Sequence, residues 1–567
     1  MERIALLYAA DAYQLPAPAA PGDPKNFGLK GRHVAGKEFF DALMRHGRWK
    51  HLTAVTLGDG DERAINETWR RSPPELTSGR QLRAVPLARL GREFLASPPA
   101  PVLHFPNPPD AKFAWVRRHT NPHSFALTGV THTICTDSVV RMITDYVTAP
   151  MEEYDCLICT SRAAERSVRA IATNYADYLA DRFGGRPELR LRLEVIPLGV
   201  DVAKYRPAFD DERAQMRKLF GVAADEFAVL SVGRLSFHSK AHPFAMYRAL
   251  AEASKRTGKK VHLLMSGKAV SAAIDGAFRT GARDFADGVR VTFVDGAHPT
   301  HPRDVWKAAD LFASLSDSIQ ETFGLALLEA QASGLAAVAS DWDGYRDIVA
   351  DGETGLLVPT FVLRDATRGA TTRLLTGETN YDHFLGECNQ SVVVDESAAV
   401  DAFARLMTDD AARNRMGEAA RRRVMERFAW AKVIGAYEYL WESLDRQRVE
   451  VAKASTPPRL PTPECYPPPE VSFAAYPSAV WTGGEMVRLN ADGLARLEQL
   501  LQHPLTGYKT APRVVSPEAI RKALGGVIGA ATVDEVAGRF VGVGADREPA
   551  LATVAWLLKY RVLERDG

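Results

Sequence analysis

The chain has 567 residues, too many for a single hydrophobic core, so its length predicts two to four domains. Its 71 Lys and Arg nearly balance its 70 Asp and Glu, which gives no electrostatic reason to expect binding to nucleic acid or an anionic membrane. No run of about 18 apolar residues occurs, and the chain opens on a strand-like segment rather than a signal peptide. Together with five scattered cysteines, these features predict a cytoplasmic protein, free or peripheral at a membrane.

Short apolar segments alternate with helical patterns through the first 205 residues, which predicts a doubly wound, parallel sheet. The expected strands lie at 3–10, 51–58, 101–109, 124–134, 154–161 and 191–201. A helix is expected before Gly47, because Ala35, Phe39 and Leu43 have helical spacing.

Glycines are concentrated at the start of this helix. Gly28, Gly31 and Gly36 would let the backbone approach a ligand at the helix N-terminus, and Arg32 adds positive charge there. A flexible loop would account for the same glycines, so both interpretations stay open at this point.

Cys156 and Cys159 form an isolated CxxC within the expected strand 154–161. Side chains alternate between the two faces of a strand, so these two sulfurs should point to opposite sides of the sheet. We therefore expect buried strand cysteines here and no metal site.

Two cations follow a strand in the second half of the chain. The strand at 227–233 delivers Arg234 at its carboxyl end, and Lys240 follows just before the helix expected at 242–253. Cations ahead of a helix N-terminus suit a diphosphate, because a departing nucleoside diphosphate gains negative charge as its bond to the sugar breaks. Ordinary surface charge is the alternative explanation.

The segment 311–358 has the order strand, polar loop, helix, strand. Its loop carries Glu321, and Glu329 lies within the helix expected at 323–333, before Gly334 as C-cap. The unpaired amides that open this helix, those of Phe323, Gly324 and Leu325, would attract an anion. Two unrelated acids on an amphipathic helix would give the same pattern.

The residue types in this segment form a motif that is more specific than its helical periodicity. Residues 318–334 read S-x-x-E-T-F-G-L-x-x-L-E-A-x-A-S-G, and residues 351–359 read D-G-x-T-G-L-L-V-P. This motif resembles the donor-binding half of retaining GT-B glycosyltransferases of glycosyltransferase family 4. The resemblance covers roughly residues 1 to 447 and implies the α/β GT-B fold, in which two Rossmann-like domains face a cleft.

The resemblance also implies roles for individual residues. Glu321 would face the donor sugar, Glu329 would bond the nucleotide ribose, and Arg234 with Lys240 would bind the diphosphate. His132, which alone reads as a structural hydrogen-bonding residue at a strand end, would reach the donor sugar near the acceptor side. The remaining donor contacts implied by the family are Gly31 and Arg32 beside the phosphates and Gly267 and Gly296 beside the ribose and base.

Two departures from the family are visible. Lys240 is followed by Ala241 where the family usually has glycine, which leaves the cation in place. The family often has a Gly-Gly-x-x-Glu turn after the next strand, whereas this chain has Asp343-Gly344-Tyr345-Arg346-Asp347. Since that turn lies near the donor sugar, the identity of the sugar is left open.

The expected domains follow from these patterns. We expect an acceptor-side domain at 1–205, a nucleotide-sugar-binding domain at 206–427, a final helix at 428–447 that returns to the first domain, a Pro-rich linker at 450–483 and a small helical module at 484–567. The module lacks the basic patch that DNA binding requires, which favours interaction with a protein partner or self-association. Helix caps are expected in the module at Asn490, Ser516 and Thr532. The insertion at 361–395 has no interpretation beyond a contact with the acceptor.

The primary hypothesis is a retaining hexosyltransferase that moves a sugar from a nucleotide-diphosphate sugar, a UDP-sugar first of all, to a hydroxyl acceptor. The acceptor would be a glycan, a lipid or a small molecule, as in polysaccharide biosynthesis. No cofactor or metal is required, because Arg234, Lys240 and helix amides can meet the charge of the leaving group. A GT-B phosphorylase or sugar-phosphate synthase, and a non-catalytic scaffold that recruits partners through its C-terminal module, are the alternatives.

Overall fold

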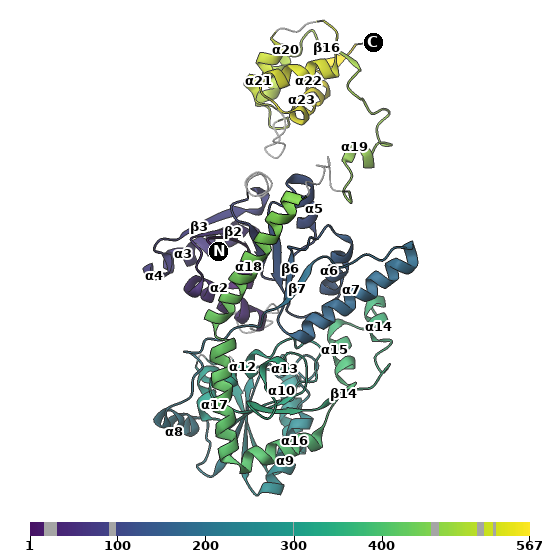
Figure 1. Cartoon of the computed structure of the whole chain (residues 1–567). Coiled ribbons are helices and arrows are strands. Elements are labelled where there is room, and N and C mark those ends of the chain that lie inside the picture. The colour runs from purple at the N-terminus through teal and green to yellow at the C-terminus, as the bar shows by residue number, and fades with distance from the viewer. Residues whose placement is uncertain are drawn as a thin grey trace. The chain divides into compact units, whose positions relative to one another are not determined.

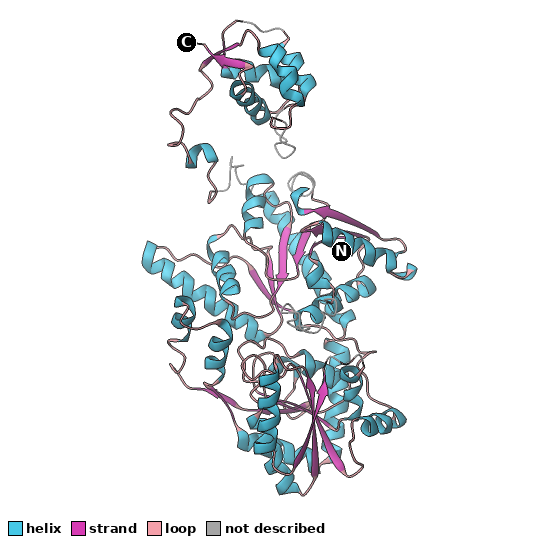
Figure 2. Ribbon diagram, turned by 180° about the vertical axis from the view of Figure 1, so that it is seen from behind, coloured by secondary structure: helices cyan, strands magenta, loops and turns pink. Residues whose placement is uncertain are grey.

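The computed structural model describes residues 1–15, 31–89, 98–296, 298, 300–454, 464–506, 515–525 and 529–566. The chain forms two compact units, Met1–Pro463 and Glu464–Gly567. The first unit contains two parallel sheets with helices on their faces (Figures 1 and 2).

The first sheet has seven parallel strands in the order β3-β2-β1-β4-β5-β6-β7. The strands are β1 Arg3–Tyr8, β2 His51–Thr56, β3 Gln81–Pro86, β4 Val102–Phe105, β5 Ala126–Val130, β6 Cys156–Cys159 and β7 Arg192–Val195. Their helices are α1 Ala10–Tyr13, α2 Gly31–His46, α3 Asp59–Arg71, α4 Pro74–Thr77, η1 Leu87–Arg89, α5 Lys112–Thr120, α6 Asp137–Thr148 and α7 Arg162–Phe183. The strand order reverses between β1 and β4, the kind of switch point at which doubly wound sheets open a ligand crevice.

The two cysteines of β6 lie in different hydrophobic clusters. Cys156 packs with Trp441 and Tyr154, whereas Cys159 packs with Phe125 and Leu127. Both thiols are free and buried. The prediction that they point to opposite faces of the sheet is confirmed.

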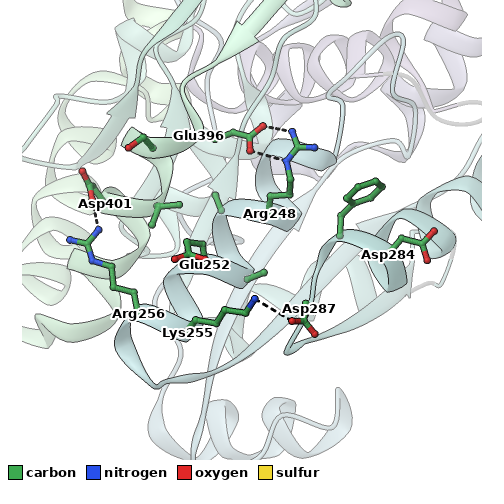
Figure 3. A pocket seen from close by; sticks show the side chains of 13 residues that line it. Arg248, Glu252, Lys255, Arg256, Asp284, Asp287, Glu396 and Asp401 are labelled. Carbon is green, nitrogen blue, oxygen red and sulfur yellow. Dashed lines mark hydrogen bonds and ion pairs between the residues drawn. The ribbon is translucent and has the colours of Figure 1, made fainter.

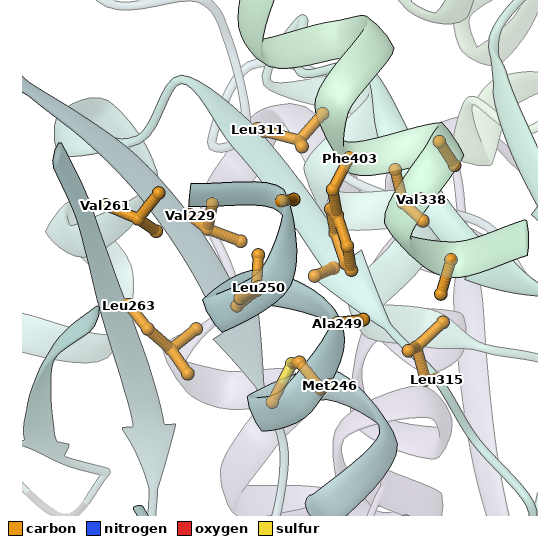
Figure 4. Close-up of a cluster of buried hydrophobic side chains, with 14 of the residues drawn as sticks. Val229, Met246, Ala249, Leu250, Val261, Leu263, Leu311, Leu315, Val338 and Phe403 are labelled. Atoms are coloured by element: carbon orange, nitrogen blue, oxygen red, sulfur yellow. The ribbon is translucent and has the colours of Figure 1, made fainter. Parts of the chain in front are cut away.

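The second sheet has six parallel strands in the order β10-β9-β8-β11-β12-β13. The strands are β8 Glu226–Val232, β9 Lys260–Gly267, β10 Val289–Asp295, β11 Leu311–Ser314, β12 Ala337–Ser340 and β13 Gly355–Val358. Their helices are α8 Asp210–Leu219, α9 Phe244–Thr257, α10 Ala272–Phe285, α11 His301–Asp304, η3 Val305–Ala308, α12 Leu325–Ala332, α13 Tyr345–Ile348, α16 Glu396–Thr408 and α17 Asp410–Arg427. Val229 of β8, Leu250 of α9 and Phe403 of α16 meet in the core on one face of this sheet (Figure 4).

The chain crosses between the two sheets twice, and the two crossings are paired. The amide of Val200 donates to the carbonyl of Phe428 at 2.9 Å, and Val200 also forms a parallel bridge with Ala429. Helix α18, Trp430–Ala454, then packs against α2 of the first sheet (Figure 1). It continues beyond residue 447, where the final helix was predicted to end. Arg448 donates to the carbonyl of His123 at 2.6 Å, and Val451 packs against the same core as Trp441 and Leu444.

The expected fold class is confirmed. The first unit has two doubly wound parallel sheets, which the chain joins by a double crossing, and helix α18 returns to the first of them. The first unit is an α/β GT-B structure of two Rossmann-like domains. Helix–sheet packing buries apolar surface on both faces of each sheet, which is what near-continuous apolar strands such as Val102–Phe105 require.

The segment without a sequence interpretation is folded. It consists of β14 Thr360–Val362, α14 Ala370–Thr376, α15 Tyr381–Asn389 and β15 Val392–Val394, with β14 and β15 paired antiparallel. Ala370, Phe384 and Leu385 form its small core.

The second unit is a helical module with a three-stranded antiparallel sheet in the order β17-β16-β18. Its elements are α19 Pro469–Ser472, β16 Met486–Leu489, α20 Gly493–Gln502, α21 Pro517–Leu524, β17 Ala531–Thr532, α22 Val533–Gly542, α23 Arg547–Lys559 and β18 Leu563–Arg565. The predicted caps at Ser516 and Thr532 are confirmed. The cap at Asn490 is wrong, because α20 begins after Asp492 and the Asn490 amide instead donates to Glu564. Across the ranges that the structure describes, no helix is long and apolar enough to span a bilayer.

Candidate active site

A lysine–glutamate pair lies between two loops that follow the central strands of the second sheet. Lys240 follows β8, Glu321 follows β11, and Lys240 Nζ lies 2.8 Å from Glu321 Oε2. The loops are also joined by Ser316, whose hydroxyl donates to the carbonyl of Lys240 at 2.8 Å. Burial acts to raise the pKa of Glu321, but Lys240 and two backbone amides outweigh burial and hold this pKa below its ordinary value. Glu321 is therefore a charged carboxylate.

Arg234 lies at the same edge of the sheet. Its Nη2 donates to Oε1 of Gln320 at 3.2 Å, and Glu321 is the acid that acts most strongly on its charge. Burial lowers the pKa of Arg234, yet a guanidinium stays protonated at neutral pH. The structure thus brings Arg234, Lys240 and Glu321 together, as the sequence predicts.

Helix α12 begins at Leu325, two residues later than predicted. Gly324 is its N-cap with φ of 107°, and a Cβ there would lie 2.5 Å from the ring of Tyr345. The amide of Phe323, expected to receive an anion, hydrogen bonds to the carboxylate of Glu321 instead. A ligand that displaced Glu321 would free this amide.

Glu329 lies farther along α12 in different surroundings. It is 9% exposed, and burial, followed by the charge of Glu38 on α2, raises its pKa to about 7. The hydroxyl of Tyr205, which follows the first crossing, hydrogen bonds to this carboxyl, and Lys204 adds a nearby positive charge. Glu329 is therefore held beside the crossing segment.

Gly267 and Gly296 lie at the ends of β9 and β10, beside Gly233 at the end of β8. A Cβ on Gly267 would lie 1.9 Å from the carbonyl oxygen of Gly233, and one on Gly296 would lie 2.7 Å from the carbonyl carbon of Gly267. The three loops pack backbone to backbone, which explains the glycines at these positions without a ligand. Their contact with a base stays a prediction.

His132 follows β5 in the first domain, where its Nε2 donates to the carbonyl of Pro106 at 2.8 Å. Burial lowers its pKa, and the charge of Arg32 lowers it further, so the imidazole is neutral. The structure therefore places Arg32, the second residue of α2, within electrostatic range of His132. Gly31 opens the same helix, while Gly28 lies outside the described residues.

Contacts join the two domains beside Glu321. Ser161, the N-cap of α7, donates to Asp343 Oδ1 at 3.2 Å, and Thr160 donates to the carbonyl of Thr322 at 3.4 Å. The amide of Arg162 donates to Asp347 Oδ2 at 2.8 Å. The Asp343–Asp347 turn, which departs from the family pattern, is therefore part of the interface between the domains.

Asp343 has an unusual environment. Its Oδ2 is shielded from solvent and has no hydrogen-bond partner in the parts of the chain that the structure describes. Burial first, and then the charge of Glu321, raise its pKa to about 8, and its φ is 45°. From the sequence, Asp343 is notable only as part of the turn that departs from the family pattern, and no role is predicted for its carboxyl group.

A second candidate pocket is a surface groove of about 640 Å³ between α9, α10 and α16 (Figure 3). Its labelled cations are each paired: Arg248 with Glu396, Arg256 with Asp401, and Lys255 with Asp287. These cations lie on helix α9, whereas ligands of doubly wound sheets bind at the carboxyl ends of the strands. We therefore place the candidate active site at Lys240 and Glu321.

Several solved structures are similar over most of the chain. Sucrose-phosphate synthase from Thermosynechococcus elongatus is 18% identical with a TM-score of 0.46, over 80% of this chain and all of that one. Anabaena HepE in complex with UDP is 16% identical with a TM-score of 0.45, over the same shares of the two chains.

Curated relatives match a shorter part of the sequence. The D-inositol 3-phosphate glycosyltransferase of Nocardia farcinica is 38% identical over 172 residues, which are 30% of this chain and 37% of the relative. The enzyme of the same name from Rhodococcus erythropolis is 34% identical over 213 residues, which are 37% of this chain and 46% of the relative. The match therefore spans less than half the length of either relative. Residues 212–391, which carry Arg234, Lys240, Glu321 and Glu329, match the family of glycosyl transferases group 1.

Proposed function

We propose that this protein is a retaining glycosyltransferase that transfers a sugar from a nucleoside-diphosphate sugar to a hydroxyl acceptor. The observation that carries the proposal is the Lys240–Glu321 pair beside Arg234, at the carboxyl ends of β8 and β11. Ligands of doubly wound sheets bind at this edge. The family match over 212–391 covers this whole group.

Cleavage of the bond to the sugar requires positive charge beside the leaving diphosphate, which gains negative charge. Arg234 and Lys240 supply it, and Lys240 is neutralised by Glu321 in the absence of ligand. A diphosphate would compete for the ammonium of Lys240 and release the Glu321 carboxylate to accept hydrogen bonds from hydroxyls of the donor sugar. Charges that are already aimed at the leaving group lower the barrier because they need no reorganisation during bond cleavage.

Retention of configuration follows if the acceptor attacks from the face that the diphosphate leaves. The departing phosphate oxygen then accepts the proton of the acceptor hydroxyl, so no separate base is needed. Glu321 positions the sugar in this scheme and forms no bond to it. We assign donor binding to the domain at 206–427, acceptor binding to the domain at 1–205, and to His132 a contact with the donor sugar near the acceptor side.

The acceptor class follows less directly, because the match spans less than half the length of either relative. Their shared name makes a phosphorylated cyclitol one acceptor to test. Glycans and lipids form the other two classes.

The test is an assay of the full chain with UDP-, GDP- and ADP-sugars against an acceptor panel. We expect release of a nucleoside diphosphate together with a glycosylated product whose anomeric configuration matches that of the donor by NMR. Silence with every donor would overturn the proposal. Phosphate-dependent cleavage of a disaccharide without nucleotide would identify a phosphorylase instead.

A further inference from the structure

We propose that Tyr381, in the insertion that follows β13, is a positioning residue for the diphosphate site. Its hydroxyl holds the Gln320 side chain, Gln320 holds the guanidinium of Arg234, and Cys135 ties this arrangement to the first domain. This inference rests on the proposed function, because it assigns Arg234 to the diphosphate.

Helix α15 supports both loops of the candidate site. In the last turn of α15, the side chain of Asn389 donates to the carbonyl of His238 at 2.6 Å. His238 lies between Arg234 and Lys240 in the sequence. In the first turn of α15, the hydroxyl of Tyr381 accepts a hydrogen bond of 3.1 Å from Nε2 of Gln320, the residue before Glu321. The insertion thus braces the loop that carries the two cations and the loop that carries the acid.

The side-chain amide of Gln320 connects Tyr381 to Arg234 through one hydrogen bond at each of its ends. Its oxygen accepts from Arg234 Nη2 at 3.2 Å, while its nitrogen donates to Tyr381. A guanidinium can only donate, so the amide oxygen of Gln320 must face Arg234, and the amide nitrogen then faces the Tyr381 hydroxyl, which accepts its hydrogen bond. In the reversed orientation, the NH2 group would face the guanidinium, donor against donor. The Tyr381 hydroxyl therefore holds the nitrogen end of the amide whose oxygen holds Arg234.

The same hydroxyl reaches the first domain. Cys135, three residues after His132, has its Sγ 3.3 Å from the Tyr381 oxygen. Cys135 and Ile319 also pack against the small core of the insertion, around Phe384 and Leu385. Separation of the two domains would break the Cys135 contacts, whereas Tyr381, Gln320 and Arg234 all belong to the second domain and would keep their hydrogen bonds.

Tyr381→Phe keeps the ring and removes the hydroxyl, which makes it the decisive variant. Calorimetry with UDP, GDP and ADP first identifies the diphosphate that wild type binds, and the matching nucleoside serves as a probe without phosphates. We expect Tyr381→Phe to weaken the diphosphate roughly fivefold, the effect of one ordinary hydrogen bond, and to leave the nucleoside unchanged. Gln320→Ala should show the same selective loss, and the double variant should lose no more than either single one.

Tyr439→Phe is the matched control, because this tyrosine on α18 is 69% exposed. Its affinities should equal those of wild type. An unchanged diphosphate affinity in Tyr381→Phe, an equal loss for the nucleoside, or additive losses in the double variant would each overturn the inference while the proposed function stands. If wild type bound none of the three diphosphates, the proposed function would fail, and the inference with it.

Discussion

Ser161 and Asp343 link the two domains through a hydrogen bond of 3.2 Å beside the candidate site. Ser161 caps α7, whose first amide lies 2.8 Å from Asp347 of the same turn as Asp343. Helix N-termini favour nearby carboxylates, so the acidic turn suits this position. Asp343, which lies in the turn that left the identity of the donor sugar open, is thus also a contact between the two domains.

The protonation of Asp343 should make stability depend on pH. Burial and Glu321 raise its pKa from 3.8 to about 8, so the folded protein keeps a proton that the unfolded chain loses. The contribution is full below about pH 4 and is lost as pH rises through about 8. In urea unfolding from pH 5 to 8, Asp343→Asn should lose less stability with rising pH than wild type.

The exposed Asp177→Asn, on α7, is the control and should follow the wild-type profile. Parallel profiles for wild type and Asp343→Asn would show that Asp343 does not retain its proton on folding.

Replacement of Lys240 should impair the chemical step. Lys240→Ala removes one of two cations aimed at the leaving group, and by analogy with loss of one preorganised donor we expect kcat to fall by about 10²–10³. Steady-state kinetics with the best donor measure this change. Lys255→Ala, in the groove of Figure 3, should be close to wild type. Near-normal turnover of Lys240→Ala would remove the charge-stabilisation step.

Gly324 should resist substitution for conformational and steric reasons. Its φ is 107°, and an added Cβ would lie 2.5 Å from the Tyr345 ring, so Gly324→Ala should destabilise the fold by about 1–3 kcal/mol. Chemical denaturation measures the difference. Gly276→Ala is the control, since Gly276 lies in α10 with open space around it, and alanine favours a helix. Equal stability of Gly324→Ala and wild type would contradict this geometry.

Chelation of divalent metals should leave activity intact. The proposal meets the charge of the leaving diphosphate with Arg234 and Lys240, so EDTA is expected to change the initial rate by less than about twofold. The same assay with added magnesium or manganese is the comparison. Loss of activity in EDTA, restored by either metal, would require a further charge in the mechanism.

Much of the fold could be predicted because buried parallel strands are short apolar runs with clear boundaries. Strand β3 was missed, since Gln81–Pro86 lies at an edge of the sheet and is mostly half-buried or exposed. The start of α12 was placed too early because Gly324 takes a left-handed conformation that periodicity does not reveal.

The part of the candidate site that could be predicted consists of residues that belong to sequence motifs at strand ends. Arg234, Lys240 and Glu321 follow strand ends, and parallel strands bring such ends to one edge. Tyr381 could not be found this way, because its partner Gln320 is 61 residues away and the intervening insertion has no family pattern. The contact of Ser161 with Asp343 could not be predicted from the sequence, since it depends on how the two domains pack.

The returning helix α18 has a consequence for synthesis on the ribosome. Trp441, which is 1% exposed, and Leu444 complete a core whose other members include Phe39 and Phe40. When residue 205 has left the ribosome, those aromatic side chains still lack their cover, whereas the second sheet can pack as soon as its own helices are made. The half of the chain translated later should therefore reach its native state first, and the half that begins the chain should mature last.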